Sequence, residues 1–320
     1  MEGDKNQKRK RVSKITKPVE ETILLEKAGY QAWKNCEDLT SVTLSNNVPR
    51  IGREAFSQCK RLKSIIISSS VTSIGDWAFW GCRALKSVII PDSVTAIDEN
   101  AFFRCSGLRS IVIPNSVIYI RREAFASCTG LTSIVIPDFL TSLYDGVFAR
   151  CTGLTSIIIP TSVTSIGHFS FGKCTGLTSI VIPNSVKSIE PRAFHECNGL
   201  TSIIIPDSVK SIGVYAFSQC SRLASVIISD SITIVERGTF HCCTGLTSVV
   251  IPDSVIDIGI QAFSGCTGLI SLVIPESVIE IRPQAFDGCN NLEQVIAPAR
   301  FHHLFPGVAS LTEPTLYLLK

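Results

Sequence analysis

The hydrophobic residues of this chain recur with a period of 23. Twelve cysteines, from Cys36 to Cys289, stand 23 residues apart with no insertion or deletion between them. When each cysteine is numbered position 1, position 4 is leucine in all twelve copies, position 7 is always Val, Ile or Leu, and position 21 is phenylalanine in eleven. A fixed period of this length is the signature of stacked structural repeats.

Within each repeat, the order of polar and apolar positions predicts the local structure. Positions 6 to 9, such as residues 133–136, alternate as a short strand does, so positions 7 and 9 face inward. Proline at position 10 ends the strand because it has no N–H for the ladder, and positions 13 and 16 return to the core. Positions 17 to 23, such as residues 75–81, are predicted to form a helical turn that buries Ala and Phe.

One such coil cannot bury both of its faces, whereas stacked coils can. The sequence therefore predicts an α/β-type repeat solenoid, a superhelix of about twelve 23-residue coils with one parallel sheet face. Departures from the repeat divide the chain into a disordered basic tail (1–18), a degenerate N-terminal cap (19–35) with Trp33 at the phenylalanine position, the solenoid (36–309) and a C-terminal cap segment (310–320).

The repeat has the pattern C-x-x-L-x-S-I-x-I-P-x-S-V-x-x-I-G-x-x-A-F-x-x, which residues 197–219 follow throughout and residues 151–173 follow except at Ser170. This pattern resembles the BspA-type leucine-rich repeat, and the resemblance covers about residues 28–309. It implies a leucine-rich-repeat superhelix. It also implies a binding role, since bacterial members of the family are known as adhesins for host matrix proteins and other cells.

Basic residues concentrate in the N-terminal third of the chain. Residues 1–128 carry a net charge of +7, residues 129–242 of 0 and residues 243–320 of −4. In the second to fourth coils, positions 2, 3 and 5 are mostly basic where later coils have Thr and Gly, and position 22 is aromatic in two successive coils. This departure predicts a partner-binding patch for an acidic protein, or else for nucleic acid or another polyanion. Its residues are Lys60, Arg61, Lys63, Trp80, Arg83, Lys86, Phe103, Arg104 and Arg109. The alternative is a solvated charged end with two isolated aromatic side chains.

The outward positions of the predicted strand form a second candidate surface. Position 6 is serine in eleven coils and position 8 is Val or Ile in eleven. A continuous apolar stripe of this length exceeds the usual patch on a soluble monomer, but strand propensity alone also favours Val and Ile. The sequence leaves both interpretations open. The candidate contact residues on this face are Ile89, Val112, Val135, Ile158 and Val181.

The cysteines are predicted to be free, buried thiols. Zinc sites need closely spaced pairs, which a 23-residue period does not supply, and parallel side chains are poorly placed for disulfides. So many free thiols favour a reducing compartment. Cys242, beside Cys243, lies outside the regular spacing and is the candidate reactive thiol. The histidines and carboxylates follow no catalytic motif, so we predict neither an enzyme nor a cofactor or metal site.

No apolar run is long enough to insert into a membrane, and residues 1–17 lack the apolar core of a secretory signal. We therefore expect an intracellular location in the cytoplasm or, from the basic run Lys8–Arg11, the nucleus; a signal sequence missing from this chain would indicate the cell surface. The predicted function is a non-enzymatic protein-binding scaffold. The alternatives are a cell-surface adhesin or matrix-binding protein, and a polyanion binder that uses the basic N-terminal third. The sequence leaves the partner's identity and the oligomeric state open.

Overall fold

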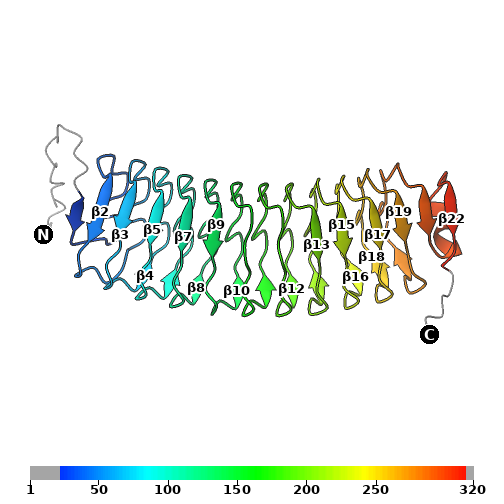
Figure 1. Cartoon of the computed structure of the whole chain (residues 1–320), viewed down its shortest axis with the longest axis horizontal. Coiled ribbons are helices and arrows are strands. Elements are labelled where there is room, and N and C mark those ends of the chain that lie inside the picture. Colours follow the sequence, from blue (N-terminus) through cyan, green and yellow to red (C-terminus); the bar gives the residue numbers. More distant parts are fainter. Residues whose placement is uncertain (1–21, 315–320) are drawn as a thin grey trace, which may run out of the picture.

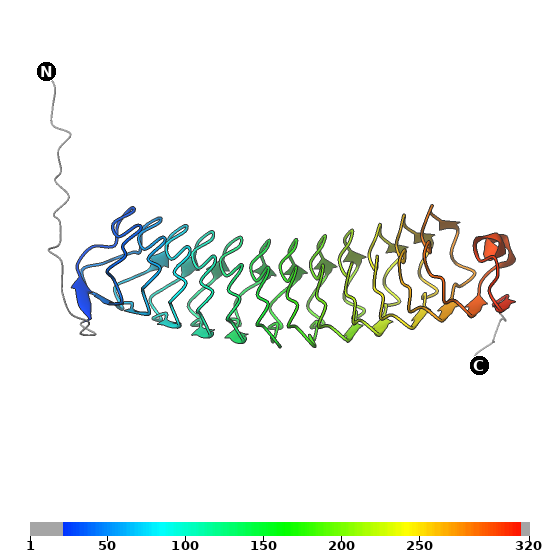
Figure 2. The same ribbon diagram turned by 90° about the horizontal axis from the view of Figure 1, so that it is seen from above.

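The computed structural model describes residues 22–314, whose coils follow one another in a single, gently bowed row (Figures 1 and 2). The predicted solenoid of about twelve coils is confirmed. Equivalent strands of successive coils pair in parallel with a shift of 23 residues, as Ser87 does with Ser110 and Ser110 with Ser133. The predicted tail (1–18), residues 19–21 of the predicted cap and residues 315–320 lie outside the described residues.

Positions 6 to 8 form the predicted parallel sheet face, which is divided into segments. Six strands pair in one sheet: β1 (Ile23–Leu25), β2 (Ser41–Leu44), β3 (Ser64–Ile66), β5 (Ser87–Ile89), β7 (Ser110–Val112) and β9 (Ser133–Val135). The next two coils continue the row only through single bridges, from Val135 to Ile158 and from Ile158 to Val181. The row resumes with β13 (Ser202–Ile204) and β15 (Ser225–Ile227), and then with β17 (Ser248–Val250), β19 (Ser271–Val273), β21 (Gln294–Ile296) and β22 (Ser310–Thr312).

A second row of two-residue strands forms at positions 15 and 16, along the lower edge of Figure 1. Its three sheets consist of β4 (Ser73–Ile74), β6 (Ala96–Ile97) and β8 (Tyr119–Ile120); of β10 (Ser142–Leu143), β11 (Ser165–Ile166), β12 (Ser188–Ile189) and β14 (Ser211–Ile212); and of β16 (Ile234–Val235), β18 (Asp257–Ile258) and β20 (Glu280–Ile281). In nearly every strand of this row the second residue is buried, as the predicted return of position 16 to the core requires.

Positions 17 to 23 form consecutive turns instead of the predicted helical turn, although the predicted burial of Ala and Phe in this segment is correct. The reason is that positions 19 and 23 both have positive φ, for example 53° at Glu123 and 60° at Ser127. Alternate N–H groups then donate to the next coil, as Phe125 does to the Val147 carbonyl at 3.0 Å. Within residues 22–314, the one helix is the 3-10 helix η1 (Ala299–Leu304).

The left-handed residues predict a stabilising substitution. Ser127→Gly removes the steric cost of a side chain at positive φ, and we expect a gain of about 1 kcal/mol in the free energy of unfolding, measured by urea denaturation. Ser156→Gly is the matched control because Ser156 is exposed and does not have positive φ. The control should lose stability, so an equal response of the two variants would contradict this explanation of the turns.

The phenylalanines of position 21 form a continuous column of rings through the core. Each ring from Phe56 to Phe286 stacks on the next, with centroids 5.1 to 6.0 Å apart and ring planes within 23° of parallel. The rings from Phe56 to Phe263 have no exposed surface, which confirms the predicted register. Because every ring touches both neighbours, the column joins the coils into one core.

From the sequence alone, the buried cysteines are most simply interpreted as small apolar side chains. In the structure they also donate hydrogen bonds. Each Sγ donates a hydrogen bond to the carbonyl 26 residues earlier, which belongs to a position-21 residue, for example from Cys128 to Phe102 at 3.2 Å and from Cys174 to Phe148 at 3.1 Å. Burial raises the pKa of both thiols to about 12. The thiols therefore stay protonated at neutral pH and serve as hydrogen-bond donors.

All thirteen cysteines are free, and eleven of them are buried; Cys36 and Cys242 are partly exposed. At pH 7 we expect an alkylating reagent to modify only these two in the folded chain, because alkylation needs an accessible thiolate. After denaturation without reductant, mass spectrometry should show all thirteen alkylated. Thiols that remain unmodified after denaturation would be oxidised, which would contradict the predicted absence of disulfides.

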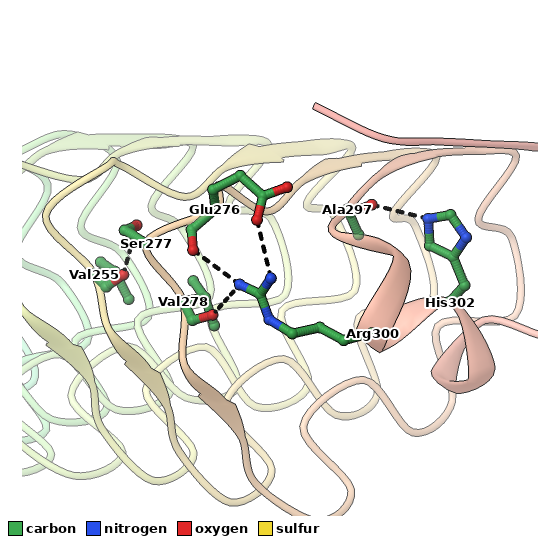
Figure 3. A network of polar contacts seen from close by, with 7 residues as sticks. All are labelled: Val255, Glu276, Ser277, Val278, Ala297, Arg300 and His302. Carbon is green, nitrogen blue, oxygen red and sulfur yellow. Dashed lines mark hydrogen bonds and ion pairs between the residues drawn. The ribbon is translucent and has the colours of Figure 1, made fainter. Parts of the chain in front are cut away.

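The two described ends close the stack in different ways. At the N-terminus β1 pairs with β2, and the partly buried Trp33 takes the place of a position-21 phenylalanine. At the C-terminus β22 pairs with β21, and Arg300 occupies position 12, where nine other coils have serine. Ser277 Oγ donates to the Val255 carbonyl at 2.9 Å, and Arg300 makes the equivalent bond to Val278 at 2.7 Å (Figure 3). Arg300 also binds the carboxylate of Glu276 at 2.9 Å.

Candidate binding surface

The side chains of position 8 form a continuous, exposed apolar column along the sheet face. Parallel register places them beside one another, as in the pairs Ile66–Ile89 and Ile204–Ile227. In nine consecutive coils they are 59% to 84% exposed, with the maximum at Ile158. These nine residues, which we call the apolar column, are Ile66, Ile89, Val112, Val135, Ile158, Val181, Ile204, Ile227 and Val250. The column includes all five contact residues suggested by the sequence, and most of the position-6 serines beside it are exposed.

The cations of position 5 stack at the N-terminal end of this face. Lys86 N–H donates to the Lys63 carbonyl at 3.1 Å, and Arg109 N–H donates to the Lys86 carbonyl at 3.0 Å, so the three residues occupy adjacent coils. All three side chains are exposed, as are Lys60, Arg61 and Arg83 at positions 2 and 3. Within residues 22–314, neither Lys86 nor Arg109 forms an ion pair. The adjacent positive charges of Lys86 and Arg109 indicate a surface that attracts anions.

The aromatic residues of the predicted patch belong to a separate cluster. Trp80 and Phe103 both contact Trp77, with ring centroids 5.7 and 6.4 Å apart, and the Arg104 guanidinium lies 5.3 Å from the Phe103 ring. The ring and cation–π contacts of Trp80 and Phe103 thus centre on Trp77 and Arg104. The sequence did not indicate Trp77, because it occupies position 19, where the residue type varies from coil to coil.

One side-chain cluster has the composition of a catalytic triad, which the sequence order did not reveal. His195 Nδ1 lies 2.6 Å from Ser218 Oγ, and His195 Nε2 lies 2.9 Å from Glu196 Oε1. Burial lowers the pKa of His195, so its imidazole is neutral at pH 7. Burial alone would raise the pKa of Glu196, but Lys173 and His195 outweigh it and hold that pKa low. Ser218 is only 1% exposed and its Oγ also donates to the Tyr215 carbonyl, so a substrate cannot reach it.

The part of the chain that the structure describes holds neither a cluster of metal ligands nor a membrane-spanning helix. Over residues 22–314, no three His, Cys, Asp or Glu side chains gather as metal ligands would. In the same range, no helix has the length and apolar character needed to span a membrane. Cys242 Sγ lies 3.3 Å from His241 Nε2, and this pair includes one of the two partly exposed thiols.

Comparison with known proteins finds similarity to leucine-rich repeat proteins. The family model for the BspA type leucine rich repeat region matches residues 26–155, 141–270 and 233–311. A leucine-rich repeat protein from Bacteroides ovatus is similar over 90% of this chain and 87% of its own, with 30% identity and a TM-score of 0.72. A leucine rich cell surface protein from Faecalibacterium prausnitzii is similar over 91% and 87%, with 32% identity and a TM-score of 0.59. No curated protein matches.

The family model spans nearly all of the described coils, and the two structural neighbours share both the fold and close to a third of the residues. The 23-residue period, the parallel strand register and the position-21 phenylalanine column agree with that match. This chain belongs to the BspA-type leucine-rich repeat family.

Proposed function

We propose that this protein is a non-enzymatic binding scaffold that contacts a protein partner through its sheet face. The apolar column is the observation that carries the proposal. Nine β-branched side chains, each more than half exposed, present roughly 900 Å² of apolar surface, whereas the largest apolar patch on a typical monomer is ~300–600 Å². Because these apolar side chains are exposed to water in nine successive coils, a partner that covers them would gain binding free energy from the hydrophobic effect.

Strand propensity explains why Val and Ile are compatible with position 8, but it does not explain their regularity. Threonine has the same branched shape and also suits strands, and it occupies position 8 in the first coil as Thr43. Position 5 is threonine in six coils, so the chain uses this residue on exposed positions. The consistent choice of Val or Ile at position 8 supports a role in binding.

The proposal predicts how two variants will behave in capture of a protein partner from lysate. Replacing Val135, Ile158 and Val181 with serine removes the middle of the column, and we expect the complex to weaken by a factor of roughly 100 or more. Replacing Lys60, Arg61, Arg83 and Lys86 with glutamate tests the basic surface. That change should weaken capture mainly at low salt, because exposed charges act over distances that salt screens.

Ile279→Ser is the matched control, since Ile279 is 74% exposed and lies outside the column at position 14. Circular dichroism checks that each variant is folded. Capture that is unchanged in the serine variant but lost in the charge-reversed variant would move the proposed site to the basic surface. If heparin retains the wild-type chain and releases it steeply with salt, the polyanion alternative gains support.

A second candidate function is that of a cell-surface binding protein. The neighbour from Faecalibacterium prausnitzii is described as a cell surface protein, which favours this location. Free thiols favour a reducing compartment in general, but buried, protonated thiols resist oxidation, so the cysteines are compatible with either location. The intracellular location expected from the sequence stays a prediction. Labelling intact producing cells with a membrane-impermeant amine reagent distinguishes the two locations.

A further inference from the structure

We infer that the apolar column is covered by a second copy of this chain, in an antiparallel dimer joined face to face. The inference rests on the proposed function and names the partner of the same surface. Three observations support it: the area of the column, its symmetry about Ile158, and the opposite charges of the two ends of the solenoid.

The area of the column suits a dimer. In a standard stable interface each partner buries about 800 Å², and the column alone offers roughly 900 Å² of apolar surface per copy. The flanking serines of position 6 would form the polar margin that such interfaces have. The surface is repetitive, so a second copy presents side chains at the same coil-to-coil spacing.

Symmetry restricts how two such faces can meet. A two-fold axis that relates facing sheets lies between them, either along the solenoid or along the strands. An axis along the solenoid reverses the strands. Even where it sets position 8 of one copy on position 8 of the other, the serines of position 6 then face position 10 instead of each other. An axis along the strands keeps the strand direction and reverses the order of the coils. Position 8 then meets position 8, and serine meets serine.

The column has a natural centre for such an axis. Ile158 is its most exposed member at 84%, and four coils of the column lie on either side of it. An axis along this strand pairs Ile158 with its own copy. The other facing pairs are Ile66 with Val250, Ile89 with Ile227, Val112 with Ile204, and Val135 with Val181.

Charge favours the same arrangement. Residues 22–128 contain 13 basic and 9 acidic side chains, a net charge of +4, and residues 243–314 contain 2 basic and 7 acidic, a net charge of −5. The antiparallel dimer brings each basic end beside an acidic end. With the axis along the solenoid, the coils of the two copies would run in the same order. Lys63, Lys86 and Arg109 would then lie near the same residues of the other copy, and this repulsion of like charges costs energy.

The test is the mass of the full chain in solution, by size-exclusion chromatography with light scattering, over a range of micromolar concentrations. We expect wild-type protein at twice 34.7 kDa. Ile158→Glu would bring the two introduced carboxylates, one from each copy, face to face at the axis. The substitution should weaken the dimer by a factor on the order of 100 and leave single chains. Ile279→Glu adds the same charge at an equally exposed isoleucine outside the column and should remain dimeric.

The orientation has its own test. In a background where Cys36 and Cys242 are replaced by serine, Ile66→Cys mixed with Val250→Cys should form an intermolecular disulfide, and Ile66→Cys alone should not. A monomeric wild-type chain, or a dimer that survives Ile158→Glu, would overturn the inference. Loss of partner capture in the column variant of a monomeric chain would still support the proposed function, so the two ideas fail separately.

Discussion

Raising the pH from 8 to 10 in the presence of a reductant is expected to unfold this protein cooperatively. The cause is the column of buried thiols, whose pKa values burial raises from the ordinary 9.0, to about 12 for Cys128 and Cys174 and in the same direction for nine others. Only the unfolded chain can release these protons near pH 9. The stabilisation is therefore complete below pH 9 and is lost as the pH rises above it.

The expected size of this effect is large. One thiol that is ionised only in the unfolded state costs about 1.4 kcal/mol per pH unit, so eleven together cost about 15 kcal/mol per pH unit once the unfolded thiols are ionised. That exceeds the whole stability of many domains, which is about 5–15 kcal/mol. Circular dichroism against pH, with urea denaturation at pH 7, 8.5 and 9.5, measures the loss.

A serine variant of three of these cysteines provides the control. The variant replaces Cys128, Cys151 and Cys174 with serine. The serine hydroxyl does not titrate in this pH range, and it can still donate to the phenylalanine carbonyl. The loss of stability per pH unit should fall by about a quarter, in proportion to the thiols removed. An equal pH dependence in wild type and variant, or a fold that is stable to pH 11, would show that the thiols do not control alkaline unfolding.

Phe171→Ala is expected to cost about 3–5 kcal/mol, because it removes a fully buried ring and leaves a cavity. The ring stacks between Phe148 and Phe194, at centroid distances of 5.7 and 5.3 Å, so both neighbouring coils lose a contact. Urea denaturation measures the cost, and hydrogen exchange should show lost protection that spreads into the adjacent coils.

Phe139→Ala is the matched control because this ring is 65% exposed at position 12. Its effect should stay within about 0.5 kcal/mol. Equal stability of Phe171→Ala and Phe139→Ala would mean that the stacked rings do not carry the core. Loss of hydrogen-exchange protection in one coil alone would contradict the view that the stacked phenylalanine rings couple the coils.

The sequence was sufficient to predict the solenoid, its register and its core. Position 21 is phenylalanine in eleven coils and position 4 is leucine in twelve, and such regularity permits one inward-facing arrangement. The turns were not predictable, because residues such as Trp77, Phe169 and Tyr215 have positive φ, which sequence rules associate mainly with glycine and asparagine. These conformations are imposed by stacking against neighbouring coils and are not encoded in the residue itself.

The candidate surface was predictable in part for a related reason. Alternation along a strand places position 8 outside, so the apolar column follows directly from the period. The relation of Trp80 to the cations depends on how the backbone bends between position 23 and position 5, which a period does not specify. The interruption of the sheet around Ile158 has no signal in the sequence, since residues 156–158 match the other strands.

Covalent footprinting of the wild-type chain tests, without any substitution, whether the sheet face is the binding surface. Hydroxyl radicals label exposed side chains, and mass spectrometry compares the single chain, obtained by dilution, with the complex that it forms with a second copy or a captured partner. We predict protection of Ile89, Val135 and Ile158 on the column, with unchanged labelling of Ile279 and Trp77. Full labelling of the column in the complex, with protection confined to the turn side around Trp77, would contradict the account.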